Sequence, residues 1–415
     1  MGQLSESFQR VSMTTTVSRY LFCLLVAGFT IHVSGMLFIT DGSRGTTISN
    51  LTLFLPALIL LLIGREWRDP LLSRQYIPLL ALLVFTVLVA LLNKGSIIKG
   101  SEQFKTALYI MLYLGAIHWM VSRDVMEKVL NLLFVIAAAA AFASIAYHLV
   151  MVDSHYLLSG DRLFKLGYEN YADFQNPIVA ALFYGVFGVY GVHQLLIRRY
   201  SCAVTLVFCL GVLSLSLYMY CTLSRGVWLG YGAAIGASVL LHNDSRSRKW
   251  LAVSAGVLLL AVILLSPVLL EQKVRGLSLR DVIWSEWLAR LGDFWLIGAG
   301  AGKSFDICIA NAQCFKQAHN LYLQFFYEYG IVGAILLLGM IGAVFVRSLN
   351  RGLRASPLGT VGFPLFLFAL LTALFDYHTV MNRPGVYWLV FWLPIGLILS
   401  NGSRAHVKSQ QATSA

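Results

Sequence analysis

The sequence predicts an all-α integral membrane protein of about twelve transmembrane helices, with one large loop on the outer side of the membrane. The composition gives the first indication: 58% of the 415 residues are hydrophobic and only 12% are charged, whereas about a quarter of the residues are charged in soluble domains. The second indication is that apolar windows of about twenty residues recur along the chain, each able to cross a hydrocarbon core of roughly 30 Å. These observations argue against a soluble all-α protein.

The apolar windows divide the chain into a single polytopic membrane domain, residues 1–400, and a disordered cytoplasmic tail, residues 401–415. The segment from Tyr20 to Thr40 is too long for the apolar core of a signal peptide, so we predict that it is the first span. The predicted spans are residues 19–40, 48–64, 76–93, 104–121, 129–150, 177–195, 201–221, 227–241, 250–270, 321–346, 358–378 and 385–400.

The distribution of charge predicts the orientation. The net charge is +12, and 17 of the 31 Lys and Arg residues fall in the segments that would be cytoplasmic if the chain starts inside, with only six of the 19 acidic residues. This bias follows the positive-inside rule, so both termini are expected in the cytoplasm. The excess of basic residues therefore indicates the orientation of the chain in the membrane and contact with anionic membrane lipids rather than a nucleic-acid site.

Two connections between spans are long, and both are expected on the outer side: residues 151–176 and residues 271–320. The second contains apolar residues at helical spacing, which predicts an amphipathic helix that lies on the membrane surface or caps a cavity. These residues are Ile283, Trp287, Leu288 and Leu291.

The large loop also contains a glycine cluster and two cysteines. The cluster, residues 298–302, requires a tight turn or close backbone approach, but no strand precedes it as a phosphate-binding loop would need. Cys308 and Cys314 could close a short disulfide loop if the outer side is oxidising, or remain free thiols. No second ligand pair accompanies them, so a zinc site is not predicted.

Ser224 and Arg225 form the first candidate functional element, at a hairpin between two spans. Ser224 can cap the following helix, whose amino end favours an anion, and Arg225 adds a fixed positive charge. The alternative is an arginine that snorkels to the membrane interface, which on position alone is the commoner case.

Arg280 and Arg290, ten residues apart in the large loop, form the second element. Both could pair with nearby acidic residues, and such surface pairs contribute little. Two guanidinium groups at one site would instead suit a pyrophosphate, because each can donate to two phosphate oxygens at once.

His319 and Asn320 form the third element, where the large loop enters the next span. A histidine beside a hydrated cavity can take a proton from a sugar hydroxyl at neutral pH. The alternative is a structural role at the helix entrance, and Asn320 is itself a suitable N-cap.

These elements occur in an order that resembles the O-antigen ligase and polymerase superfamily. The segments Ala318–Leu323 and Glu328–Gly333 resemble its H-N-x-Y-L…E-x-G-x-x-G signature, and Ser224-Arg225-Gly226 resembles its S-R-G element. The segment from Arg280 to Trp284, followed by the glycine cluster, resembles its R-x-x-x-W…G-x-G-x-G segment. Looser matches to an earlier outer loop are Arg162 and Gln175-Asn176-Pro177.

The resemblance implies a GT-C-like glycosyltransferase of the bacterial inner membrane with its active site facing the periplasm. Such a ligase transfers a glycan from undecaprenyl pyrophosphate to a sugar hydroxyl of lipid A–core oligosaccharide in lipopolysaccharide biosynthesis. It inverts the anomeric centre and needs neither a metal nor a nucleotide cofactor. The absence of an Asp-x-Asp motif from the predicted outer loops agrees with this expectation.

The resemblance also implies roles for individual residues. Arg225 and Arg280 would hold the pyrophosphate and offset the charge that builds on it, and His319 would act as the general base or orient the acceptor hydroxyl. The candidates for substrate binding are Arg290, Arg162, Asn320 and Tyr322.

Other functions stay open at this point. An O-antigen polymerase extends a lipid-linked glycan, and a protein-glycosylating ligase uses a protein hydroxyl; the His-Asn motif does not separate them from a lipopolysaccharide ligase. We favour the latter because the large loop has no extra domain to recruit a protein. A transporter would be expected to show broken helices in related halves or acidic relays inside spans, and neither is evident. A structural scaffold would not need arginines and a histidine on one face.

Overall fold

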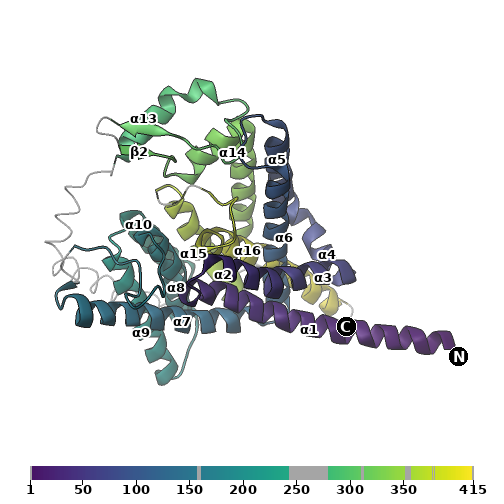
Figure 1. Ribbon diagram of the computed structural model, residues 1–415. Helices are drawn as coiled ribbons and strands as arrows, with labels where there is room; N and C mark the ends of the chain where they lie inside the picture. Colours follow the sequence, from purple (N-terminus) through teal and green to yellow (C-terminus); the bar gives the residue numbers. More distant parts are fainter. Residues whose placement is uncertain are drawn as a thin grey trace.

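The computed structural model describes residues 2–156, 160–242, 279–309, 313–350, 357–375, 377 and 379–413, and most of them are helical (Figure 1). Within these residues, eight helices are long and apolar enough to cross a membrane, and three shorter apolar helices accompany them. These helices coincide with eleven of the twelve predicted spans; the ninth, residues 250–270, lies outside the described residues. The all-α fold with several apolar helices, as in a multi-pass membrane protein, is therefore confirmed. The exact number of spans stays a prediction.

The described elements follow one another with mostly short connections. They are α1 (Gly2–Phe38), α2 (Gly42–Ser49), η1 (Asn50–Phe54), α3 (Leu55–Ile63), α4 (Arg65–Arg68), η2 (Asp69–Leu72), η3 (Arg74–Tyr76), α5 (Ile77–Leu92), α6 (Gly100–Ser122), α7 (Met126–Tyr147), η4 (His148–Val152), α8 (Pro177–Ile197), α9 (Cys202–Cys221), α10 (Arg225–Leu241), α13 (Arg280–Ala289), η6 (Leu291–Asp293), β1 (Ile307–Ile309), β2 (Gln313–Phe315), α14 (Leu321–Ser348), α15 (Pro357–Thr372) and α16 (Val386–Thr413).

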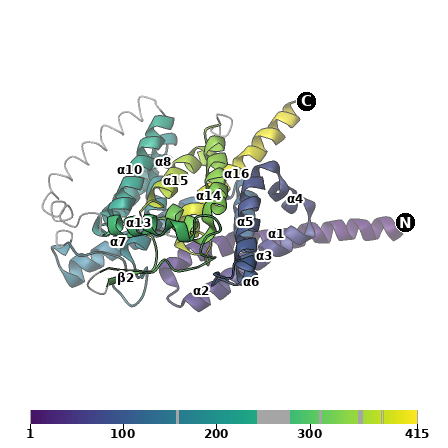
Figure 2. The same ribbon diagram turned by 90° about the horizontal axis from the view of Figure 1, so that it is seen from above.

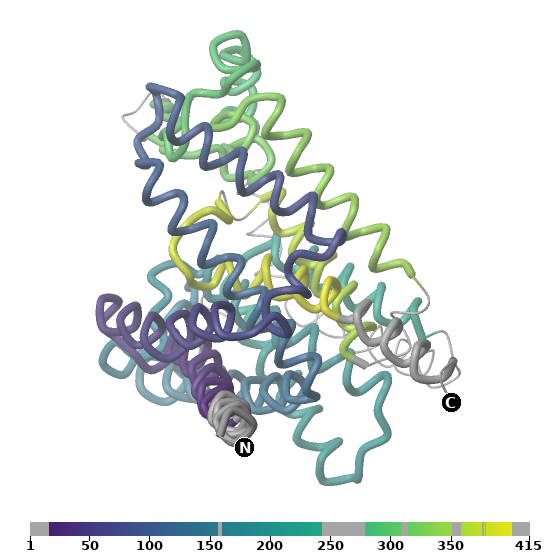
Figure 3. Tube along the Cα trace, turned by 90° about the vertical axis from the view of Figure 1, so that its right-hand side faces the viewer, coloured from purple at the N-terminus to yellow at the C-terminus, as the bar shows by residue number. Residues whose placement is uncertain are grey.

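Helix α8 lies at the centre of the bundle, where it contacts α7, α9, α10, α15 and α16. Its side chains are buried almost without a break from Ala180 to Leu196. A helix that is apolar on all sides is expected in such a central position. On the other side of the molecule α5 runs beside α6 and α14 (Figure 3), while α1 runs across their direction (Figure 1).

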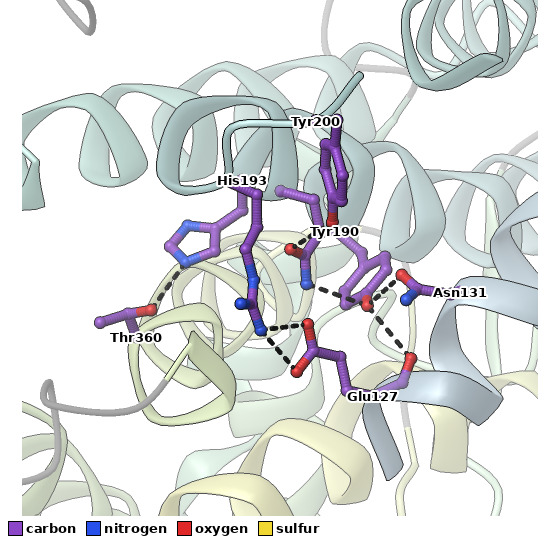
Figure 4. A network of polar contacts seen from close by, with 8 residues as sticks. Glu127, Asn131, Tyr190, His193, Tyr200 and Thr360 are labelled. Carbon is purple, nitrogen blue, oxygen red and sulfur yellow. Dashed lines mark hydrogen bonds and ion pairs between the residues drawn. The ribbon is translucent and has the colours of Figure 1, made fainter. Parts of the chain in front are cut away.

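A network of polar side chains joins α7, α8 and α15 near the carboxyl end of α8 (Figure 4). Arg198, just beyond α8, donates to both carboxylate oxygens of Glu127 on α7 at 2.6 and 2.9 Å. His193 of α8, fully buried, lies 3.0 Å from the hydroxyl of Thr360 on α15. Polar contacts of this kind hold apolar helices together where the surroundings offer no water. The other members of the network are Asn131, Tyr190, Gln194 and Tyr200.

The predicted disordered tail is wrong for residues 401–413, because α16 continues as a helix to Thr413. Extending an existing helix requires no new nucleation, so a segment that would not start a helix can continue one. No proline follows Ser400 in the sequence, and the helix continues through Asn401-Gly402, a pair that is common in turns.

The described part of the large loop forms a cap over the amino end of α14 (Figure 1). It consists of α13, η6 and the antiparallel hairpin of β1 and β2, in which Cys308 lies opposite Cys314. In the view from above, α13 overlies the region between α10 and α14 (Figure 2). The cap buries its own cluster of apolar side chains against α14, which includes Ile283, Trp287 and Phe294 from the loop and Tyr327 from α14.

Candidate active site

The carboxyl end of α15 is the point at which the three candidate elements meet. The backbone N–H of Leu321, the first residue of α14, donates to the carbonyl of Ala373 at 2.8 Å. Arg280, the first residue of α13, donates from Nε and Nη2 to the carbonyl of Phe375 at 3.0 and 2.7 Å. The helix that carries the His-Asn motif and the helix that carries Arg280 are therefore both tied to the segment that follows α15.

Arg225 comes to the same end because α10 packs against α15. A Cβ atom added to Gly230 of α10 would lie 2.7 Å from the Cγ2 atom of Thr372, the last residue of α15. Arg225 lies five residues before Gly230, which is about 7.5 Å along the helix axis. We call this end of the bundle, formed by the start of α10, α13 and α14 and the residues after α15, the loop face.

Arg162 joins the loop face through the turn that precedes Arg225. Its Nε atom donates to the carbonyl of Thr222 at 2.8 Å and its Nη2 atom to the hydroxyl of Ser224 at 3.2 Å. The predicted cap is wrong in its detail: Ser224 occupies the N-cap position of α10, but its side chain makes no hydrogen bond to the helix N–H groups. Its hydroxyl instead accepts from Arg162, which a pattern of neighbouring residues cannot reveal.

His319 is half-buried directly before α14 and beside the charge of Arg280. Burial lowers the pKa of its imidazole below the 6.5 of an unperturbed histidine, and the positive charge of Arg280 lowers this pKa further. The imidazole is therefore neutral at pH 7 and able to accept a proton.

The backbone is left-handed at or directly before each of the three elements. Leu223, Leu279 and His319 have φ values of 51°, 63° and 49°. Left-handed conformations cost non-glycine residues about 1–3 kcal/mol each and persist only where the surrounding structure enforces them, which is common at functional sites. Helix-period patterns in the sequence do not reveal such conformations.

Asn320 and Tyr322 make structural contacts on the loop face. The side chain of Asn320 accepts from the N–H groups of Tyr322 and Leu323 at 2.9 and 3.1 Å, which confirms it as an N-cap. The hydroxyl of Tyr322 donates to the carbonyl of Leu370 in α15 at 3.0 Å. Both residues thus help to fix α14 against α15, and their part in substrate binding stays a prediction.

Arg290 lies at the opposite end of α13 from Arg280. Ten helical residues correspond to about 15 Å, so the structure does not bring these two guanidinium groups side by side. Arg290 donates to the carbonyl of Asp306 at 3.2 Å and lies over the ring of Phe305, 5.0 Å from its centroid. The structure thus gives Arg290 contacts within the cap, and its role in binding stays a prediction.

The predicted amphipathic helix is α13, with one correction to its apolar face. Ile283 and Trp287 are buried, but the side chain of Leu288 is 64% exposed. Trp284 takes its place on the inner face and lies near the ring of Phe375. The helix packs on the amino-terminal part of α14. Ile283 and Trp287 are buried there in one cluster with other apolar side chains of the cap and with Tyr327 of α14.

The glycine cluster is a backbone junction with α14. The N–H groups of Ala299 and Gly300 donate to the carbonyls of Tyr327 and Glu328 at 2.7 and 3.1 Å. At this level α14 is broken by Gly330, whose φ of 66° and ψ of −168° are not helical. The expected close backbone approach is therefore confirmed. The break also makes residues 321–329 a separate helical segment, whereas the sequence predicted one continuous span over residues 321–346.

Replacing Gly330 by alanine is expected to destabilise the protein by at least about 2 kcal/mol, because only glycine adopts this backbone conformation readily. In addition, a Cβ atom there would lie 2.4 Å from the carbonyl oxygen of Leu296. Thermal unfolding in detergent measures the effect. Gly339→Ala in the same helix is the matched control, since nothing lies within 4 Å of its Cβ position. Equal melting temperatures for the two variants would contradict the interpretation.

Cys308 and Cys314 form a disulfide across the β1–β2 hairpin. The structure thus decides between the two states that the sequence left open. Within the described parts of the chain, no group of three or more His, Cys, Asp or Glu side chains is placed to hold a metal ion.

Comparison with known proteins gives two matches. A family model described as O-antigen ligase matches residues 210–338, a stretch that contains Arg225, Arg280 and His319. The O-antigen ligase of Pseudomonas aeruginosa strain PAO1 is 26% identical over 231 residues, which are 55% of this chain and 55% of that protein. The match thus spans about half the length of the curated relative.

Proposed function

Because this chain belongs to the O-antigen ligase superfamily, we propose that it transfers a glycan from undecaprenyl pyrophosphate to the lipid A–core oligosaccharide. The observation that carries the proposal is the convergence of Arg225, Arg280 and His319 at the loop face, from three elements far apart in the sequence. Two cations and one neutral imidazole match the demands of a reaction in which a hydroxyl is deprotonated and a pyrophosphate departs.

In the proposed reaction the acceptor hydroxyl gives its proton to His319 as its oxygen attacks the anomeric carbon of the donor glycan. The new bond joins that oxygen to the anomeric carbon, on the face opposite the leaving group, so the configuration inverts. The bond between the anomeric carbon and the phosphate oxygen breaks, and its electron pair stays with undecaprenyl pyrophosphate. Arg225 and Arg280 offset the developing negative charge, and no metal or nucleotide takes part.

The loop face is proposed to lie on the periplasmic side of the bacterial inner membrane, with both termini in the cytoplasm. The excess of basic residues in the segments assigned to the cytoplasm supports this orientation. The disulfide between Cys308 and Cys314 supports it independently, because structural disulfides persist in oxidising compartments such as the periplasm.

A purified two-substrate assay tests the function. The protein is incubated in detergent or nanodiscs with undecaprenyl-pyrophosphate-linked glycan, lipid A–core and a chelator. Glycan attached to lipid A–core is the expected result. Lengthening of the lipid-linked glycan without transfer to lipid A–core would identify a polymerase instead. If neither product forms, a protein acceptor or a transport function has to be considered.

The pH dependence of transfer follows from the lowered pKa of His319. The base must be neutral, so the rate is expected to be constant at neutral pH and to fall only below pH 6.5. Removing the positive charge of Arg280 would raise the pKa of His319, so the acid limb of kcat/KM in Arg280→Gln should move to higher pH. An acid limb above pH 6.5 in the unmodified protein would contradict this role of His319.

A further inference from the structure

We propose that Gln324 and Trp284 are positioning residues that clamp the backbone of Ala318 from two sides and thereby hold His319 in place. Glu328 orients Gln324 for this task. The inference rests on the proposed function, since it concerns how the base of that reaction is held. None of these three side chains is among the residues that the sequence motifs assigned to catalysis or binding.

Gln324 holds the N–H side of Ala318. Its Oε1 atom accepts from the backbone N–H of Ala318 at 3.1 Å. Its Nε2 atom donates to Oε1 of Glu328 at 2.9 Å and to the carbonyl of Lys303 at 3.3 Å. Because a backbone N–H can only donate, the amide of Gln324 must turn its oxygen towards Ala318. Gln324 and Glu328 are both almost completely buried, so water does not replace these bonds.

Glu328 fixes the direction of this chain of hydrogen bonds. One of its oxygens accepts from Nε2 of Gln324 and the other accepts from the backbone N–H of Gly302 at 2.8 Å. The side chain at position 328 must therefore offer an acceptor at both of its ends. A glutamine there would offer one acceptor and one donor, and one of the two N–H groups would face another donor. The glycine cluster and the residue before His319 are thus connected through Glu328 and Gln324.

Trp284 holds the opposite side of the same residue. Its indole Nε1–H donates to the carbonyl of Ala318 at 3.0 Å. Trp284 lies on α13, one turn after Arg280, which is itself bound to the carbonyl of Phe375. The clamp therefore connects His319 to the helix that carries Arg280.

His319 requires such a clamp because its own backbone is left-handed. Without external constraints a non-glycine residue returns to more common conformations, which would turn the imidazole away from its place beside Arg280. On the other side of His319, Asn320 and Leu321 are already fixed by the N-cap and by the bond to Ala373. The two contacts to Ala318 complete the constraint on the amino-terminal side.

Two tryptophans of α13 provide a matched test. Trp284→Phe removes the donor to Ala318, while Trp287→Phe removes an equivalent donor, which binds the carbonyl of Leu323 at 3.1 Å. Each variant loses one hydrogen bond from α13, to the residue Ala318 before α14 or to Leu323 within α14, and the two should lose similar thermal stability. Only Trp284→Phe should also lose kcat, by on the order of tenfold, the rate equivalent of one hydrogen bond, with KM for the donor unchanged. Equal kcat values for the two variants would overturn the inference.

Exchanging the two polar residues of the clamp provides a rescue test. Gln324→Met and Glu328→Gln should each lower kcat by about tenfold or more. The double variant Gln324→Glu with Glu328→Gln should recover most of the turnover. In it, the new carboxylate accepts from Ala318 and from the new amide, whose oxygen still accepts from Gly302. Gln317→Met, one residue before Ala318, is the control. If the double variant melts like the unmodified protein but is no more active than Glu328→Gln, the clamp does not act as proposed.

The same assay separates failure of this inference from failure of the proposed function. If the unmodified protein transfers glycan and His319→Asn does not, but Trp284→Phe and Gln324→Met match their controls, the clamp alone is refuted. If the unmodified protein transfers no glycan, the function is refuted and the clamp with it. Should Gln324→Met fail to fold, the double variant still decides. It restores the hydrogen bonds to Ala318 and Gly302 and the bond between the two side chains with residues of the original size, and it loses only the long donation to the carbonyl of Lys303.

Discussion

Replacing His319 by alanine is expected to lower the turnover of glycan transfer by roughly 10²–10⁴-fold, the usual contribution of a general base. The imidazole is the one group at the loop face that we assign to accept the proton of the acceptor hydroxyl, and its lowered pKa keeps it neutral for that purpose. KM for the lipid-linked donor should change little, since the pyrophosphate is held by other residues. Initial rates at varied donor concentration measure both quantities.

A second substitution at position 319 separates chemistry from backbone geometry. Alanine disfavours the left-handed conformation found there, whereas asparagine tolerates it and has no basic nitrogen. Transfer should therefore be lost equally in His319→Asn. His155→Ala is the control, because the side chain of His155 is exposed in the loop before α8. Near-normal turnover by His319→Asn would show that His319 has only a structural role.

Replacing Arg280 by alanine is expected to lower kcat by roughly 10²–10³-fold, the typical effect of losing one group that stabilises developing negative charge. The loss should fall on kcat more than on KM, because the charge on the pyrophosphate grows only as the glycosidic bond breaks. Arg280→Lys should recover only part of the rate. A lysine keeps the charge, but it cannot reproduce the planar fork by which Arg280 binds the carbonyl of Phe375.

Arg225→Ala should behave in the same way as Arg280→Ala, since both residues come to the same end of α15. Lys316→Ala removes an exposed cation from the same cap and serves as the control for a general loss of positive charge. If Lys316→Ala reduced kcat as much as Arg280→Ala, the effect would reflect the overall field of the loop rather than contact with the leaving group.

The linear motifs predicted the main candidates of the site but not how they are held. His319, Arg280 and Arg225 could be selected because each stands beside other motif residues in the sequence. Gln324 could not be selected in this way, because its contacts are to Ala318, Lys303 and Glu328. A polar residue in an apolar helix was the only available signal, and such a signal does not name its partner.

Two further features depended on contacts that the sequence pattern does not contain. Helical spacing placed Leu288 on the apolar face of α13. In the structure, the side of α13 that faces the rest of the cap carries Trp284 instead, so Leu288 is exposed. The spacing of Arg280 and Arg290 left open whether they share a site. In the structure they stand at the two ends of one helix, α13, which places them about 15 Å apart.

The sequence by itself determined that this protein is a helical bundle of apolar segments, where most of these segments begin and end, and that its motifs resemble those of O-antigen ligases. These properties are local, because the hydropathy of about twenty consecutive residues is enough to define a span. Only the tertiary structure decided that α14 breaks at Gly330, that the end of α15 gathers Arg225, Arg280 and His319, and that Ser224 binds Arg162. These features depend on left-handed backbone and on hydrogen bonds between residues far apart in the chain, which form only when the helices pack.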